Sequence, residues 1–116
     1  MIRRFLQVTP GLYRGSAPSP QDVLDLKDNY GVKKIVSLDE ASGNRIDRSC
    51  KILNIKHIML PIDGTKKSLL NFLRNNFKEL LIDGGPTFVH CKYGKDRTGL
   101  AVALFKCKYM GISPQD

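Results

Sequence analysis

The segment from His90 to Gly99 constrains the fold of this 116-residue chain more than any other feature. It reads His-Cys-Lys-Tyr-Gly-Lys-Asp-Arg-Thr-Gly. The short run 86–89 before it has the length and the β-forming side chains of a strand, and the apolar run 100–105 after it has helical length without a breaker. We therefore expect a tight turn that leads from the end of a strand into the first turn of a helix.

Such a turn is suited to binding an anion. Successive backbone N–H groups converge on one point, and the helix dipole adds positive potential there. Cys91 begins this loop and Arg97 ends it. A free thiol has a pKa of about 8.5, and a helix N-terminus with nearby cations lowers that pKa. The arrangement predicts attack by a thiolate on phosphorus.

The other side chains of the loop suit the same chemistry. A thiolate at Cys91 can form a phosphocysteine intermediate, and the guanidinium of Arg97 can pair with two phosphate oxygens at once. The hydroxyl of Thr98 is placed to ease departure of the thiolate in a second step. Gly94 lets the backbone turn inward without a Cβ in the way. We expect the phosphate to be bound by six loop residues: Lys92, Tyr93, Gly94, Lys95, Asp96 and Arg97.

The pattern His-Cys-x-x-Gly-x-x-Arg-Thr resembles the active-site loop of the protein tyrosine phosphatase superfamily, in its compact dual-specificity branch. A more diffuse resemblance runs from about Phe5 to Gly111 and includes residues 11–16 and 34–38. The resemblance implies a cysteine-dependent phosphatase that needs no metal or other cofactor. It also implies that His90 donates a hydrogen bond that fixes the loop and the surroundings of Cys91.

The departing oxygen of a phosphate ester needs a proton donor, and the resemblance implies an aspartate on a loop that follows a strand. Asp63 fits this position, because it comes after an expected strand and directly before a glycine. Asp96, inside the cysteine loop, is the rival acid. Asp39 and Glu40, at the end of another expected strand, are more distant alternatives.

The substrate class stays open. Lys92 and Lys95 resemble the basic loop residues of phosphoinositide and inositol phosphate phosphatases, whereas the branch as a whole implies action on phosphotyrosine, phosphoserine and phosphothreonine. RNA 5′-phosphatase activity is an alternative that the net charge of +8 permits, although no aromatic run for base stacking is present. A non-catalytic phosphate-binding module is disfavoured because Cys91 and Arg97 are both intact. A sulfurtransferase of the rhodanese kind would need neither His90 nor the Arg-Thr ending.

Composition places further bounds on the chain. Three cysteines at unrelated spacings indicate neither a disulfide framework nor a zinc site, and with His57 as the second of two histidines we expect no metal at His90. Cys50 is either a buried inert thiol or a partner for an oxidised Cys91, and Cys107 is expected in the core. A reactive thiol, without an apolar export signal or an apolar run of membrane-spanning length, predicts a cytoplasmic protein. Its expected partners are phosphorylated anionic substrates, with nucleic acid less favoured.

The rest of the sequence predicts alternating strands and helices. The expected strands are 5–8, 12–15, 33–38, 57–60 and the run into Cys91, and the expected helices are 20–30, 44–53, 65–82 and 97–110. This alternation predicts an α/β fold, a central largely parallel sheet flanked by helices in one domain over residues 1–116. Ligands in such sheets bind at the carboxyl ends of strands, where Cys91 falls. Arg14 and Ser16 are expected at the rim of the site.

The last four residues, Ser113 to Asp116, repeat the helix start of residues 19–22 letter for letter. We expect the chain to stop at the first turn of a further helix, so that this cysteine-phosphatase fold lacks one or more C-terminal helices. The alternative is a natural terminus with a frayed tail. If a helix is missing, the face around Leu104, Phe105 and Tyr109 lacks its cover, and we expect self-association through it.

Overall fold

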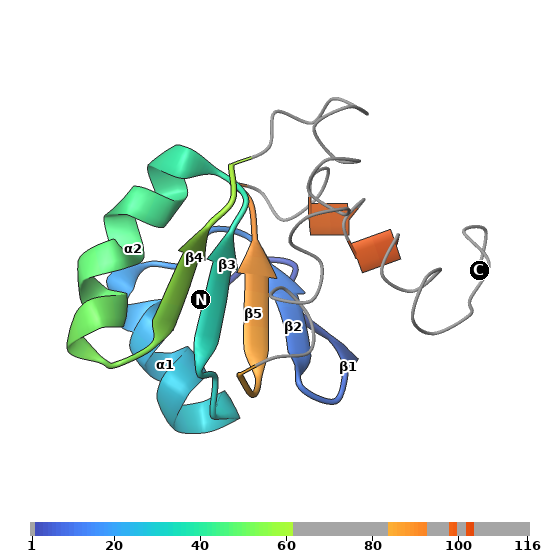
Figure 1. Ribbon diagram of the computed structural model, residues 1–116. Coiled ribbons are helices and arrows are strands. Elements are labelled where there is room, and N and C mark those ends of the chain that lie inside the picture. Colours follow the sequence, from blue (N-terminus) through green and yellow to red (C-terminus); the bar gives the residue numbers. More distant parts are fainter. Residues whose placement is uncertain (1, 62–83, 93–97, 100–101, 104–116) are drawn as a thin grey trace.

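The computed structural model describes residues 2–61, 84–92, 98–99 and 102–103. Five strands form one sheet in the order β1-β2-β5-β3-β4, with two helices on one of its sides (Figure 1). The elements in chain order are β1 (Leu6–Thr9), β2 (Leu12–Gly15), α1 (Pro20–Tyr30), β3 (Lys34–Ser37), α2 (Glu40–Ile52), β4 (Lys56–Met59) and β5 (Thr87–His90). Residues 98, 99, 102 and 103 are also helical.

The sheet is largely parallel, as the sequence predicts. β2, β5, β3 and β4 run parallel to one another, and only the pair β1 and β2 is antiparallel. That pair is joined by a tight turn in which Gly11 has a φ of +88°, a left-handed conformation that glycine adopts without the cost of a Cβ. β5 comes last in the chain among the strands described, yet it lies in the centre of the sheet between β2 and β3.

Helix α1 has the ends that its sequence predicts. The hydroxyl of Ser19 accepts from the backbone N–H of Asp22 over 3.1 Å, and the Asp22 carboxylate accepts from the N–H of Ser19 over 2.9 Å. This reciprocal capping satisfies two backbone donors that the first turn leaves unpaired. At the other end, Gly31 is left-handed with a φ of +66° and terminates the helix.

Helix α2 begins earlier than the sequence prediction, which placed its start at Asn44. The helix starts at Glu40, because the carboxylate of Asp39 caps it by accepting from the backbone N–H of Ser42 over 3.0 Å. The prediction was therefore wrong by one turn. It passed over Asp39 as a cap and considered that residue only as a candidate acid.

Alternation along the strands divides the core into two clusters. Ile35 and Phe88 pack on the side of the sheet that α1 and α2 cover, which we name the helical face. Their chain neighbours Val36 and Val89 pack on the other side, the opposite face, because successive side chains of a strand point in opposite directions. Figure 1 shows both labelled helices on the helical face.

The remaining predicted strands agree with the structure to within one residue at each end. The predicted fold class, an α/β architecture with a largely parallel central sheet, is confirmed. The predicted helix 65–82, most of the predicted helix 97–110 and the expected self-association face lie outside the described residues. Within the described part of the chain, no helix is long and apolar enough to cross a membrane.

Candidate active site

Cys91 lies directly after β5, at the carboxyl end of the central strand. Thr98 and Gly99 are already helical, so the predicted strand and the predicted helix are found on the two sides of the loop. The side chain of Cys91 is buried in the cluster on the opposite face, together with Val102 from the helix that follows. The local sequence thus places a thiol between the end of a strand and the start of a helix, where an anion is favoured.

Two backbone hydrogen bonds hold the chain in place around Cys91, one at the residue before it and one at the residue after it. The N–H of Leu38 donates to the carbonyl oxygen of His90 over 2.8 Å, and the N–H of Ala17 donates to the carbonyl oxygen of Lys92 over 3.1 Å. Leu38 follows β3 and Ala17 follows β2, so the two strands that flank β5 both hold the start of the loop. The side chain of Lys92 is exposed.

His90 is fully buried and contacts the loop as predicted. Its Nδ1 lies 3.1 Å from the carbonyl oxygen of Cys91, and since a carbonyl can only accept, Nδ1 carries the proton. Its ring stacks against Phe88, with the ring centres 5.7 Å apart. Burial lowers the pKa of His90 to about 4, which makes this histidine neutral near pH 7.

The hydrogen bonding continues beyond His90 into a relay that the sequence analysis missed. The hydroxyl oxygen of Ser37 lies 2.7 Å from Nε2 of His90 and 2.7 Å from Nε2 of His57. Nδ1 of His57 lies 2.9 Å from a carboxylate oxygen of Asp47. A continuous row of side chains therefore joins α2 to the first peptide group of the cysteine loop.

Strand register explains why these side chains meet. Ser37 pairs with His90 across the parallel strands β3 and β5, and both side chains point to the helical face. Close packing of α2 helps: a Cβ added at Gly43 would lie 2.7 Å from the Cβ of Ser37. The available signal was a serine in a buried strand, but its partners depend on which strands are neighbours.

Thr98, the predicted assistant to thiolate departure, is fully buried. Its hydroxyl oxygen has no hydrogen-bond partner among the residues that the structure describes. An unpaired buried hydroxyl is costly, and such groups in native proteins call for an explanation such as a catalytic role. A thiolate or a bound anion next to Thr98 would be a suitable partner for this hydroxyl.

The residues expected at the rim take different positions. A Cβ added at Gly99 would lie 3.4 Å from a guanidinium nitrogen of Arg14, so Arg14 lies against the helix after the loop. Ser16 instead holds the N-terminal segment, because its hydroxyl accepts from the N–H of Arg3 over 2.9 Å. The carboxylate of Asp39 is engaged as the cap of α2, which weakens its candidacy as the acid.

Asp63 and the loop residues 93–97 lie outside the described residues, as does Cys107. The structure therefore leaves the choice between Asp63 and Asp96 open, and the phosphate-binding role of Arg97 remains a prediction.

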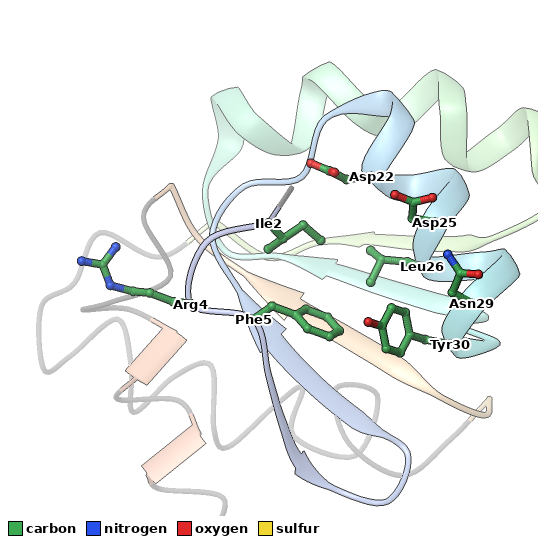
Figure 2. Close-up of a pocket in the computed structure, with 8 residues that line it drawn as sticks. All are labelled: Ile2, Arg4, Phe5, Asp22, Asp25, Leu26, Asn29 and Tyr30. Atoms are coloured by element: carbon green, nitrogen blue, oxygen red, sulfur yellow. The ribbon is translucent and has the colours of Figure 1, made fainter.

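A hollow of about 560 Å³ lies elsewhere in the molecule (Figure 2). Figure 2 shows Phe5 and Tyr30 side by side in its wall, with Asp22 and Asp25 along α1. It is on the helical face, and its walls include none of the predicted site residues. We therefore do not assign the chemistry of Cys91 to this hollow.

Comparison with known proteins identifies the family of this chain. A model described as the tyrosine phosphatase family matches residues 7–116. The chain belongs to this family. The match confirms the predicted membership of the protein tyrosine phosphatase superfamily.

Among curated tyrosine phosphatase relatives, the dual specificity protein phosphatase TpbA of Pseudomonas aeruginosa is 30% identical over 112 residues, which are 94% of this chain and 49% of TpbA. The inositol diphosphatase DSP2 of Oryza sativa subsp. japonica is 30% identical over 111 residues, or 88% of this chain and 52% of that protein. The chain thus spans about half the length of the curated relatives that it matches.

Solved structures of other proteins share the fold. A crystal structure of P. aeruginosa TpbA has a TM-score of 0.75 at 26% identity, over 96% of this chain and 67% of that one. The catalytic domain of the PP-IP phosphatase Siw14 from S. cerevisiae has a TM-score of 0.76 at 23% identity, over 97% and 71% of the two chains.

Proposed function

We propose that this chain hydrolyses phosphate monoesters through a phosphocysteine intermediate on Cys91. The observation that carries the proposal is the position of Cys91, directly after the central parallel strand and ahead of a helix that contains Thr98. Ligands of α/β sheets bind at the carboxyl ends of strands, and a helix N-terminus favours a phosphate group. Membership of the tyrosine phosphatase family supports the same chemistry.

The reaction has two displacements at phosphorus. In the first, the sulfur of Cys91 attacks phosphorus while the bond to the leaving oxygen breaks, and the acid gives that oxygen its proton. In the second, the same carboxylate takes a proton from water, the water oxygen attacks phosphorus, and the S–P bond breaks to return the thiolate. We assign the acid to Asp63, with Asp96 as the rival.

The transition states carry negative charge on the phosphoryl oxygens. Arg97 and the backbone amides of the loop are assigned to stabilise that charge, because preorganised donors in such a site supply much of the rate enhancement. Thr98 is assigned to donate a hydrogen bond to the departing sulfur, which leaves as the thiolate. Its hydroxyl is buried and has no hydrogen-bond partner in the described part of the chain, which supports this role.

For the substrate we propose a dual-specificity range, covering phosphoproteins or inositol phosphates. The names of the relatives support both, since they include a dual specificity protein phosphatase and an inositol diphosphatase. A variant of TpbA is solved in complex with phosphotyrosine. The two lysines of the loop, Lys92 and Lys95, favour a substrate with more than one phosphate. A reactive thiol needs a reducing compartment, which supports the cytoplasm as the location.

The replacement Cys91→Ser tests the function. We expect turnover of an aryl phosphate to fall by about 10³-fold or more, the scale on which loss of a nucleophile acts. Binding of inorganic phosphate, measured by calorimetry, should persist because the loop amides and Arg97 remain. Cys50→Ala, in the cluster on the helical face, is the matched control and should keep its activity. Undiminished turnover by Cys91→Ser would disprove the phosphocysteine mechanism.

A further inference from the structure

The hollow on the helical face lies between helix α1 and the segment of residues 2–5 (Figure 2). Its volume of about 560 Å³ is in the range of pockets that bind small ligands or side chains of a partner. The proposed phosphatase chemistry does not use it. Its wall on the side of α1 is formed by Asp22, Asp25, Leu26, Asn29 and Tyr30.

The wall from α1 carries negative charge. Residues three or four apart lie on one face of a helix, so Asp22, Asp25 and Asn29 border the hollow together. The carboxylate of Asp22 is buried and accepts the hydrogen bond from the N–H of Ser19. Asp25 is exposed. Of the two carboxylates, Asp25 is therefore the one that a ligand reaches directly.

Aromatic rings stand beside these carboxylates. The ring centres of Phe5 and Tyr30 are 4.9 Å apart with a tilt of 56°, and those of Tyr13 and Tyr30 are 5.4 Å apart. These contacts fix the ring of Tyr30, which is nonetheless 44% exposed. The face of an aromatic ring attracts a cation. A fixed, exposed ring next to a carboxylate is thus suited to a positively charged group.

The second wall, residues 2–5, is held firmly against the sheet. The N–H of Arg3 donates to the hydroxyl of Ser16 over 2.9 Å, and the N–H of Ser16 donates to the carbonyl oxygen of Arg3 over 2.8 Å. A Cβ added at Gly15 would lie 2.6 Å from a methyl group of Ile2, so this segment packs directly on β2. The hollow therefore has two fixed walls.

Arg4 is the one basic residue among the described residues that line the hollow. Its φ is +54°, a left-handed conformation that is uncommon for residues other than glycine. Figure 2 shows its side chain pointing away from Phe5 and Tyr30. The hollow thus keeps an acidic and aromatic lining on a chain whose net charge is +8.

We propose that the hollow binds an arginine side chain of a protein partner, together with an apolar side chain next to that arginine. A guanidinium stacks on an aromatic face and pairs with a carboxylate, which fits Tyr30 and Asp25. The apolar neighbour would pack on Ile2 and Leu26, which also line the hollow. The proposal goes beyond the proposed function and does not depend on the chemistry of Cys91.

Other ligand classes fit this lining less well. An anion would face the charges of Asp22 and Asp25. A purely apolar ligand would cover these carboxylates without giving them a partner, which is costly. A small amine would pair with Asp25 but leave the apolar part of the wall uncovered. Because the net charge repels a basic partner at long range, binding must come from contacts inside the hollow.

An NMR titration tests the proposal. The capped tripeptide acetyl-Leu-Arg-Leu-amide, added to nitrogen-15-labelled protein, should shift the backbone amides of Phe5, Leu26 and Tyr30 and leave Lys92 unshifted. The control peptide carries citrulline, which has the shape of arginine without its charge, and should bind at least fivefold more weakly. Equal affinity for the two peptides, or shifts confined to Lys92 and its neighbours, would overturn the proposal.

Two variants locate the contact. Asp25→Asn should weaken binding of the arginine peptide by about fivefold, the upper range for an exposed ion pair. Tyr30→Leu keeps an apolar side chain but removes the ring, and should weaken binding by about two- to fivefold. The matched control Asp28→Asn removes an exposed charge from the same helix outside the hollow and should bind as the wild type does. Thermal melts check that each variant is folded.

The same titration separates other occupants. Spermidine, an amine without apolar side chains, should bind more weakly than the tripeptide, and equal or tighter binding would overturn the assignment to a protein segment. Amide shifts around the hollow on dilution of the protein alone would identify a second copy as the occupant and also overturn it. Cys91→Ser should bind the tripeptide as the wild type does, so the result is independent of the proposed function.

Discussion

Cys50 and Cys91 are both buried, but they pack on opposite faces of the same sheet. Cys50 belongs to the cluster with Ile35 and Phe88, and Cys91 belongs to the cluster with Val36 and Val89. Burial, together with the nearby Asp47 carboxylate, raises the pKa of Cys50 to about 11. Two roles were considered for Cys50. Its placement supports the role of an inert buried thiol and disfavours a disulfide with Cys91.

Cysteine labelling follows from this difference. In the folded protein near neutral pH, iodoacetamide should modify Cys91 much faster than Cys50, because only a thiolate reacts and Cys50 stays protonated. Peptide mapping by mass spectrometry measures both sites, and labelling after unfolding shows that Cys50 is intact. Mild peroxide should give no disulfide between Cys50 and Cys91. A linked pair of peptides would contradict their placement on opposite faces.

The two candidate acids can be separated by the leaving group. With an alkyl phosphate, Asp63→Asn should lower kcat by roughly 10²-fold or more, the usual scale of general acid catalysis. With an aryl phosphate whose leaving group departs easily, the same variant should lose little. Asp96→Asn is the comparison, measured on both substrates. If the leaving-group dependence appears in Asp96→Asn instead, the acid is Asp96.

Substrate class is tested through the charge of the loop. Replacing Lys92 and Lys95 together by alanine should raise KM for a multiply phosphorylated inositol far more than for a singly phosphorylated tyrosine peptide. The reason is that only the inositol presents a second phosphate to these lysines. Steady-state kinetics of both substrates at one pH and one ionic strength give the comparison. An equal rise in KM for both substrates would mean that the lysines act through the overall positive potential of the site and do not contact a second phosphate.

The buried His90 predicts a loss of stability in acid. Its pKa falls from 6.5 to about 4 on folding, so the unfolded chain takes up the proton first as the pH decreases. The contribution of neutral His90 to the free energy of unfolding is fully present above pH 6.5, declines between pH 6.5 and about 4, and is lost at lower pH. The free energy of unfolding lost in this way is on the order of 3 kcal/mol, because a change of one in a pKa corresponds to about 1.4 kcal/mol.

Urea unfolding across this range measures the effect. The control is His90→Gln, whose side chain can donate and accept but does not titrate. The difference in unfolding free energy between wild type and control should decrease as the pH falls through this window. A difference that is independent of pH would show that folding does not lower the pKa of His90.

Local signals in the sequence were enough for several parts of this protein. The limits of α1 follow from Ser19 and Gly31, because a cap and a left-handed terminator act through hydrogen bonds within a few residues. The strand before Cys91 and the helix after it also follow from adjacent residues. Such features depend on chain neighbours, and a sequence displays its chain neighbours directly.

Other parts depended on which distant segments become neighbours. The sequence showed Ser37, His57 and Asp47 as unrelated residues, and only the insertion of β5 beside β3 brings Ser37 within 2.7 Å of His90. The packing of α2 against β4 then adds Asp47. A hydrogen-bond relay needs atoms placed to within a few tenths of an ångström. Strand order and register supply that placement, and they are fixed by the packing of the whole sheet rather than by any one segment.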